Sequence, residues 1–160
     1  MRRAFADCDA LVFVMATGIV VRTIAPLVQS KASDPAVLVL DQRGKHVISL
    51  LSGHLGGANA MAEQAAAYLG GEAVITTATD VEHVPAFDLF AKENHLTIEN
   101  LEELKYISGA LVAGEPVSLC TAFPVEKNAF PETVQIQPFS ETPPHACACL
   151  LYTSDAADEL

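Results

Sequence analysis

The stretch from Ser52 to Asn59 has the residue types of a small polar site. It reads Ser-Gly-His-Leu-Gly-Gly-Ala-Asn and stands between an expected strand and an expected helix. Glycines let a backbone approach a ligand closely, and the unpaired N–H groups of a helix N-terminus favour an anion. The spacing of Gly53, Gly56 and Gly57 matches neither a Walker A loop nor the dinucleotide fingerprint. We therefore expect either a carboxylate or phosphate site or a plain turn followed by a helix.

His54 is the residue of this stretch that is suited to acid–base chemistry. A histidine can act as a general base or as an electrophile near neutral pH, and the alternative is a structural or solvent-exposed loop residue. His46, His83 and His95 have no second ligand at the spacing of a metal site. We therefore expect no metal bound by the protein itself.

Two earlier segments place charged groups beside expected strands. Thr17 and Gly18 follow an apolar run, and Arg22 then either holds a carboxylate or is a solvated helix charge. Lys31 and Asp34 supply a cation and a carboxylate before the next strand, although Asp followed by Pro also opens turns. Both segments suit an oxygen-rich anionic ligand.

A third polar segment covers residues 76–80. Thr77, Thr79 and Asp80 come at the C-terminal end of a short expected strand, where open α/β sheets bind ligands. The alternative is that Thr79 or Asp80 caps a helix. The three segments would line one crevice if they faced the same edge of the sheet, which the sequence leaves open.

The elements that must position these groups alternate between strands and helices. Continuous apolar runs at 9–15 and 36–40 indicate strands covered on both faces, and a hairpin turn joins the second run to a strand at 46–50. A helix is expected over 58–69 and a short strand over 73–77. This order predicts an α/β fold, a three-layer sandwich with a largely parallel sheet.

The texture of the sequence changes after Asp80, where two helices and two short strands are expected in a less regular order. We therefore predict an N-terminal α/β domain over residues 1–80 and a smaller α/β central domain over 81–148. Met1 leads within ten residues into a strand, so we expect the first domain to be truncated at its start. Residues 149–160 resemble the translation of a sequencing adapter and are interpreted as non-native, with an ordinary acidic tail as the alternative.

Composition excludes several classes of protein. The 160 residues include 20 Asp and Glu against 9 Lys and Arg, a formal net charge of -11, and 51% are hydrophobic. That hydrophobic fraction is too high for disorder, and the absence of a basic stripe argues against nucleic acid as a partner. The longest apolar run is too short to span a membrane, and the four cysteines lack paired spacing. We expect a soluble, cytoplasmic protein.

Four segments are characteristic of one known family. They are VFVMATGIVVRTIAPL at 12–27, KASDPAV at 31–37, ISLLSGHLGGAN at 48–59 and ITTATD at 75–80. Over roughly residues 8–125 the chain resembles the CbiG family, the cobalt-precorrin-5A hydrolases of anaerobic cobalamin biosynthesis. The resemblance implies the family's N-terminal and central domains, with its C-terminal domain absent.

The resemblance implies hydrolysis of the δ-lactone of cobalt-precorrin-5A, with release of acetaldehyde and formation of cobalt-precorrin-5B. The cobalt arrives within the substrate, so no cofactor is expected. Lactone opening needs a base to activate water, for which His54 is the first candidate and Asp80 or Asp34 the next. The residues expected to bind the substrate, some of them by steadying the oxyanion, are Thr17, Gly18, Arg22, Lys31, Ser52, Gly53, Gly56, Gly57, Asn59, Thr77 and Thr79.

The expected partner is a cobalt-corrinoid small molecule. The same interpretation allows a homodimer and contacts with other corrin-pathway enzymes. Two other hypotheses stay open at this point. One is a non-catalytic module that holds the macrocycle while an absent domain does the chemistry, and the other is a generic anion-binding α/β domain.

Overall fold

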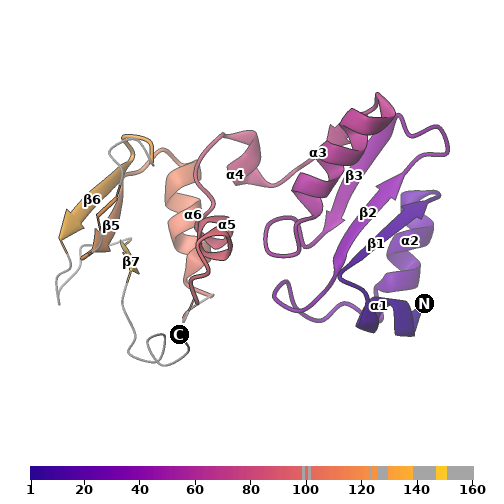
Figure 1. Ribbon diagram of the computed structural model, residues 1–160, viewed down its shortest axis with the longest axis horizontal. Helices are drawn as coiled ribbons and strands as arrows, with labels where there is room; N and C mark the ends of the chain where they lie inside the picture. Colours follow the sequence, from indigo (N-terminus) through magenta and orange to yellow (C-terminus); the bar gives the residue numbers. More distant parts are fainter. Residues whose placement is uncertain (99, 101, 123, 126–129, 139–146, 151–160) are drawn as a thin grey trace.

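A computed structural model shows two β-sheets, each with its own helices, following one another along the chain (Figure 1). No helix in the part of the chain that the structure describes is long and apolar enough to cross a membrane. The described residues are 1–98, 100, 102–122, 124–125, 130–138 and 147–150.

The first sheet has four strands in the order β1-β2-β3-β4. Its strands are β1 (Ala10–Val14), β2 (Ala36–Leu40), β3 (His46–Leu51) and β4 (Glu72–Val74). β1 pairs with β2 and β3 with β4 in parallel, whereas β2 and β3 form an antiparallel hairpin. Asp41 closes the hairpin by accepting hydrogen bonds from the amides of Arg43 and His46, at 2.8 and 2.7 Å. The sheet is largely parallel, as predicted, with one reversal at its centre.

Helices cover both faces of this sheet and make three layers. They are α1 (Arg2–Asp7), α2 (Thr17–Ile24) and α3 (Ala58–Leu69). On one face, Phe5 of α1 and Val20 of α2 pack in one core with Val39 of β2. On the other face, Ala62 of α3 packs in a second core with Leu38 of β2. All five residues of β2 are buried, which confirms a strand covered on both faces.

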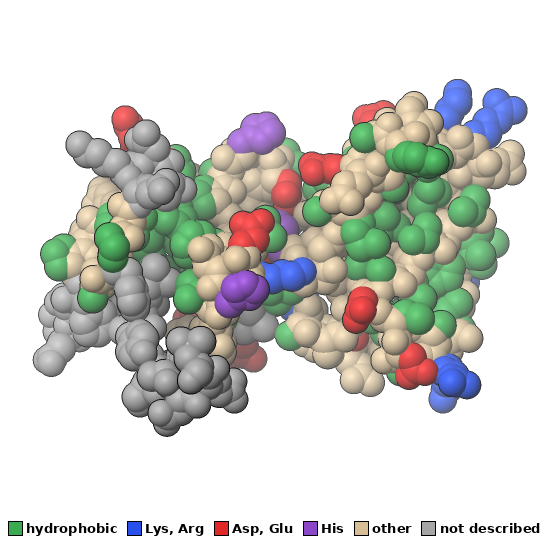
Figure 2. Space-filling view, viewed as in Figure 1, with side chains coloured by type: hydrophobic (Ala, Val, Ile, Leu, Met, Phe, Trp, Pro, Cys, Tyr) green, Lys and Arg blue, Asp and Glu red, His purple; other side chains and the backbone are tan. Residues whose placement is uncertain are grey.

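β1 is not covered on both faces, and that prediction was wrong. Val12 and Val14 are 57% and 59% exposed, whereas Phe13 between them is buried. β1 is the outermost strand of the sheet, and α3 packs across β2, β3 and β4. One face of β1 is therefore left open, and Figure 2 shows hydrophobic side chains at the surface over this region.

The second sheet is smaller and entirely parallel, in the order β6-β5-β7. Its core joins Phe87, Leu111 and Leu119, so helices pack against the sheet, which confirms a second α/β arrangement. Residues 149 and 150 of the expected non-native tail end the last strand, and 151–160 lie outside the described residues. The elements are α4 (Ala78–Val81), α5 (Phe87–Glu93), α6 (Leu104–Val112), β5 (Val117–Thr121), β6 (Val134–Pro138) and β7 (Cys147–Leu150).

Candidate active site

Because of the β2–β3 hairpin, the predicted site residues lie at two opposite edges of the first sheet, where the strands begin and end. Because β3 runs antiparallel to β2, and β4 parallel to β3, both β3 and β4 end at the edge where β2 begins. Residues 31–34, 52–59 and 77–80 therefore share that edge. Residues 17–22 follow β1, which ends beside the end of β2 at the opposite edge. Five residues of extended strand, roughly 16 Å, separate the two edges.

The residues at the opposite edge are engaged with their own helix. Arg22 donates from Nη1 to the carbonyl oxygen of Gly18 at 2.9 Å, and its side chain is exposed. Thr17 and Gly18 form the first turn of α2. The structure does not bring these three residues to the others predicted for the site.

The glycine-rich loop after β3 is shaped by close contacts within the chain. A Cβ on Gly53 would lie 2.8 Å from Oδ1 of Asn59, and one on Gly56 would collide with Ser52. Ser52 in turn donates from its hydroxyl to the carbonyl oxygen of Asp34, 3.0 Å away. The glycines at these two positions therefore permit the loop to fold against its own neighbours.

The amides at the start of α3 are paired within the same loop. Gly57 N donates to the His54 carbonyl at 3.0 Å, Ala58 N to Ser52 at 3.2 Å and Asn59 N to Gly53 at 3.1 Å. These are the N–H groups that the sequence suggested for an anion. The backbone of the loop thus has the geometry of the alternative prediction, a turn followed by a helix, and the side chains carry the polar chemistry.

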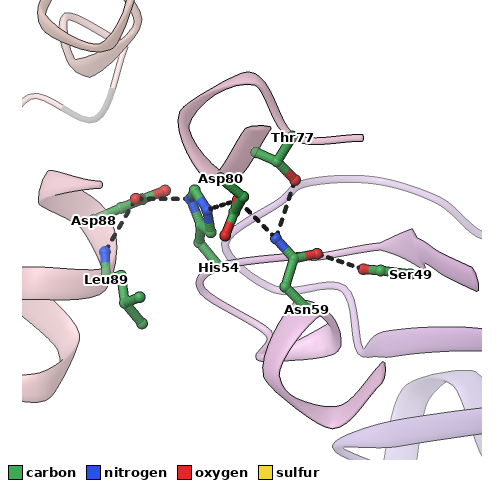
Figure 3. Close-up of polar contacts among 7 residues, drawn as sticks. All are labelled: Ser49, His54, Asn59, Thr77, Asp80, Asp88 and Leu89. Atoms are coloured by element: carbon green, nitrogen blue, oxygen red, sulfur yellow. Dashed lines mark hydrogen bonds and ion pairs between the residues drawn. The ribbon is translucent and has the colours of Figure 1, made fainter. Parts of the chain in front are cut away.

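The side chain of His54 lies between two carboxylates (Figure 3). Its Nε2 is 2.7 Å from Oδ2 of Asp80, and its Nδ1 is 3.1 Å from Oδ1 of Asp88. The side chains of His54 and Asp88 are 10% and 14% exposed, and that of Asp80 is 33% exposed. Asp80 is therefore the member of this cluster that is most open to solvent.

The two carboxylates decide the charge of His54. The hydrogen bond to Asp88 outweighs the cost of burial and, together with the bond to Asp80 and both negative charges, raises the pKa of His54 to about 9. Burial raises the pKa of Asp88, but the hydrogen bond and charge of His54, the Leu89 amide and the charge of Lys31 together outweigh it and leave that pKa below its usual value. At neutral pH His54 is an imidazolium, and both of its N–H groups donate.

Asn59 connects this cluster to the sheet. Its Nδ2 donates to Oδ2 of Asp80 and to Oγ1 of Thr77, both at 3.0 Å. Its Oδ1 accepts a hydrogen bond from the hydroxyl of Ser49 on β3, at 2.6 Å. The network of Ser49, Asn59, Thr77, Asp80, His54 and Asp88 is drawn in Figure 3 and is hereafter called the histidine network.

Two other predicted residues are buried near the network. The carboxylate of Asp34 accepts hydrogen bonds from the amides of Gln29 and Ser30, at 2.9 and 3.0 Å, so it stabilises the turn before β2. Thr79 is buried in α4, and its hydroxyl has no partner within the described parts of the chain.

A cavity of about 410 Å³ lies on the same edge of the sheet. Lys31 and Lys92 line it together with the carboxylates of Asp7, Asp9 and Asp34. Lys92 donates from Nζ to the carbonyl oxygen of Leu55, at 2.9 Å. The positive charge of Lys31 also helps to lower the pKa of Asp88, so this cavity and the histidine network are electrostatic neighbours.

Three residues of this site were missed by sequence reasoning. Asp88 and Lys92 lie on α5, in the segment after the expected domain boundary, and Ser49 lies inside β3. An acidic residue in the first turn of a helix is ordinary, and so is a serine within a strand. No local signal distinguished them, because their partners are at least ten positions away along the chain.

The polar groups of the site do not form a metal centre. Within the residues that the structure describes, no group of three or more His, Cys, Asp or Glu side chains could hold a metal ion. The cluster instead offers a carboxylate that is partly exposed, a buried imidazolium and two lysines beside a cavity. Such a set can bind acidic groups and move a proton from water.

Two family models match successive parts of the chain. The model described as cobalamin synthesis G N-terminal, abbreviated CbiG_N, matches residues 1–80. The model described as cobalamin biosynthesis central region, abbreviated CbiG_mid, matches residues 85–159.

Curated proteins and a solved structure give the same result. The chain is 50% identical over 119 residues to a protein of Salmonella typhimurium named cobalt-precorrin-5A hydrolase, and 41% identical over 115 residues to one of that name from Priestia megaterium. These matches cover 74% and 72% of the chain but 34% and 31% of the relatives, so it spans about a third of their length. The chain also resembles the crystal structure of a cobalamin biosynthesis protein G homologue from Sulfolobus solfataricus, with a TM-score of 0.52 and 27% sequence identity. This match covers 91% of the chain and 45% of the Sulfolobus protein.

Proposed function

Because this chain belongs to the CbiG family of cobalamin synthesis proteins, we propose that it takes part in the reaction for which its relatives are named, the hydrolysis of cobalt-precorrin-5A. The observation that carries the proposal is the histidine network, which holds a partly exposed carboxylate on the same edge of the sheet as a cavity that Lys31 and Lys92 help to line. The substrate is a cobalt-bound macrocycle with many carboxylates, and the cobalt enters as part of it.

The proposed reaction opens a δ-lactone on the macrocycle. Water adds to the lactone carbonyl carbon, the ring C–O bond breaks, and a proton from water reaches the departing oxygen. The bond between the bridging carbon and the macrocycle then breaks and leaves its electron pair on the macrocycle, which takes up a proton to give cobalt-precorrin-5B. The hydroxyl on the bridging carbon loses its proton and becomes the carbonyl of acetaldehyde, which also carries away the methyl group. The protein must therefore supply a base for water, stabilise negative charge on oxygen and hold the acidic side chains of the macrocycle.

Asp80 has the geometry of the base. Its Oδ2 accepts hydrogen bonds from His54 and Asn59, whereas its Oδ1 has no hydrogen-bond partner within the described residues. His54 is less suited to that role in this arrangement, because it is already protonated at neutral pH. We assign to His54 a positioning role in place of the general base, in which its N–H group donates to Oδ2 of Asp80 and orients that carboxylate.

Lys31 and Lys92 are placed to hold the acidic side chains of the substrate. Both line the cavity, and both are exposed. A lysine ammonium is a point charge that binds a carboxylate without demanding one geometry. Asp34, which also lines the cavity, is committed to backbone amides, so we assign it to holding the loop.

Acetaldehyde release tests this assignment directly. The full-length protein should release acetaldehyde from cobalt-precorrin-5A, and His54→Ala and Asp80→Asn should each lower kcat at least about tenfold. His46→Ala is the matched control, because His46 also pairs with an aspartate, Asp41, but on the exposed hairpin turn. Its kcat should stay at the wild-type value.

Three results would count against the assignment. Unchanged turnover in His54→Ala and Asp80→Asn would remove both residues from the mechanism. Substrate binding by the unaltered full-length protein without acetaldehyde release would favour a non-catalytic binding module. Absence of both binding and turnover would reject the corrinoid substrate.

A further inference from the structure

Asn59, which is buried, and Ser49, which is half-buried, form a hydrogen-bonded pair beside the proposed base, and the sequence suggested no such role for either. We infer that they are positioning residues, which hold Asp80 so that its Oδ1 faces the reacting water. This inference rests on the proposed function and deepens it. Asn59 then acts through Asp80, whereas the sequence predicted that it contacts the substrate directly.

The charge of Asp80 determines how the Asn59 amide is oriented. An ionised carboxylate only accepts hydrogen bonds, so the group that faces Oδ2 of Asp80 must be the NH₂ of Asn59. The amide oxygen then faces the hydroxyl of Ser49 at 2.6 Å, and Ser49 must donate. Ser49 thereby fixes the amide in the orientation that Asp80 requires.

No donor of Asn59 is left for a ligand. The NH₂ group has two hydrogens, and Thr77 and Asp80 accept them at 3.0 Å each. Asn59 is 6% exposed and sits in the first turn of α3, below the loop. An effect of this side chain on the reaction must therefore pass through Asp80 or Thr77, and of these two Asp80 is the proposed base.

Two donors meet at one oxygen of Asp80. His54 Nε2 and Asn59 Nδ2 both donate to Oδ2, and they come from the two ends of the segment that closes β3 and opens α3. Losing the Asn59 donor would leave His54 as the only described contact that orients this carboxylate. A shift of the base by about 1 Å lowers the rate about a hundredfold in well-positioned sites.

Substitution of Asn59 should change kcat and its pH dependence in a way that loss of a purely structural contact would not. Asn59→Ala should lower kcat about tenfold to a hundredfold with little change in KM, at every pH. Asn59→Asp places a carboxyl group against Asp80, and the pair shares a proton at low pH. The shared proton restores a donor to Asp80, so kcat relative to wild type should rise as pH is lowered from about 8 to about 5.

A second pair of variants guards against loss of folding. Ser49→Ala removes the hydroxyl that orients the amide and should lower kcat, and Ser49→Thr keeps a hydroxyl and should recover most of the loss. Circular dichroism at each pH checks that the variants remain folded. An unchanged kcat in Asn59→Ala, or equal kcat in Ser49→Ala and Ser49→Thr, would overturn the inference.

The hydrogen-bond geometry can be tested without substrate. Both side-chain amide protons of Asn59 should exchange slowly with solvent by nuclear magnetic resonance, and Ser49→Ala should speed their exchange. Fast exchange in the wild-type protein would overturn the positioning contact even if the protein is active. Slow exchange in a protein that releases no acetaldehyde would instead support the contact and reject the proposed function.

Discussion

At the scale of single residues, His54 illustrates how charge and burial compete. Its side chain is 10% exposed, and burial alone would favour the neutral imidazole. Asp88 and Asp80 reverse that preference, and the pKa of His54 rises to about 9. At neutral pH His54 therefore does not act as a neutral base, and it places a positive charge beside Asp80.

This charge makes the stability of the protein depend on pH. Because the folded pKa of about 9 lies above the unfolded value of 6.5, the contribution of His54 is complete below about pH 6.5. It is lost as pH rises through about 9. We expect the free energy of unfolding, measured by urea denaturation, to decrease over that interval by on the order of 3 kcal/mol.

Variants of the pair separate this effect from other titrating groups. His54→Asn should remove most of the decrease, and Asp88→Asn should reduce it, because Asp88 is the largest contributor to the raised pKa. A decrease of the same size in wild type and His54→Asn would show that other groups cause it.

At the scale of elements, the loop from Ser52 to Gly57 is held by short contacts on every side. Its carbonyl oxygens accept from the first amides of α3, and its Leu55 carbonyl accepts from Lys92 on α5. The backbone of the loop that presents His54 is therefore hydrogen-bonded both to the start of α3 and to α5. This arrangement depends on Gly53 and Gly56, where the chain packs too closely for a side chain.

The packing at Gly56 leads to a stability prediction with an internal control. Gly56→Ala would drive a Cβ into Ser52, so we expect a loss of about 1–3 kcal/mol in the free energy of unfolding. Gly109→Ala lies in the interior of α6, where a Cβ meets nothing within 4 Å, and should add about 0.5–1 kcal/mol. Thermal or urea unfolding of both variants measures the difference, and an equal change in both would contradict the loop contacts.

At the scale of the whole molecule, the candidate site joins the two parts that the family models distinguish. His54, Asp80 and Asn59 belong to the region matched by the first model, and Asp88 and Lys92 to the region matched by the second. Charged side chains of both signs, with histidine, gather in the middle of the face shown in Figure 2, between the two sheets. The histidine network is complete only when α5 contacts the loop.

The direction of the strands places two cationic side chains at opposite edges of the first sheet. Lys31 lies on the edge of the histidine network, and Arg22 lies on the opposite edge. We expect Lys31→Ala to raise the KM for cobalt-precorrin-5A several times more than Arg22→Ala does, although each removes one positive charge. Steady-state kinetics of the two variants test this, and a larger effect from Arg22→Ala would place the substrate on the other edge.

Much of the fold could be predicted because it depends on local patterns. The apolar run at 36–40 forms a fully buried strand, the turn after it closes a hairpin, and the alanine-rich helix follows the glycine loop. The exposure of one face of β1 could not be predicted, because its residues Ala10–Val14 are as continuously apolar as those of β2. Its position as the outermost strand follows from the strand order of the sheet, which no local sequence pattern predicts.

The sequence by itself determined the family, the alternation of strands and helices and most residues of the candidate site, because these depend on residue types at short spacing. Only the tertiary structure decided which of those residues meet. The β2–β3 hairpin separates Arg22 from His54, and the contact with α5 brings Asp88 to a histidine 34 positions earlier. That contact also decides the charge of His54, because the pKa of a buried group depends on the partners that folding places around it.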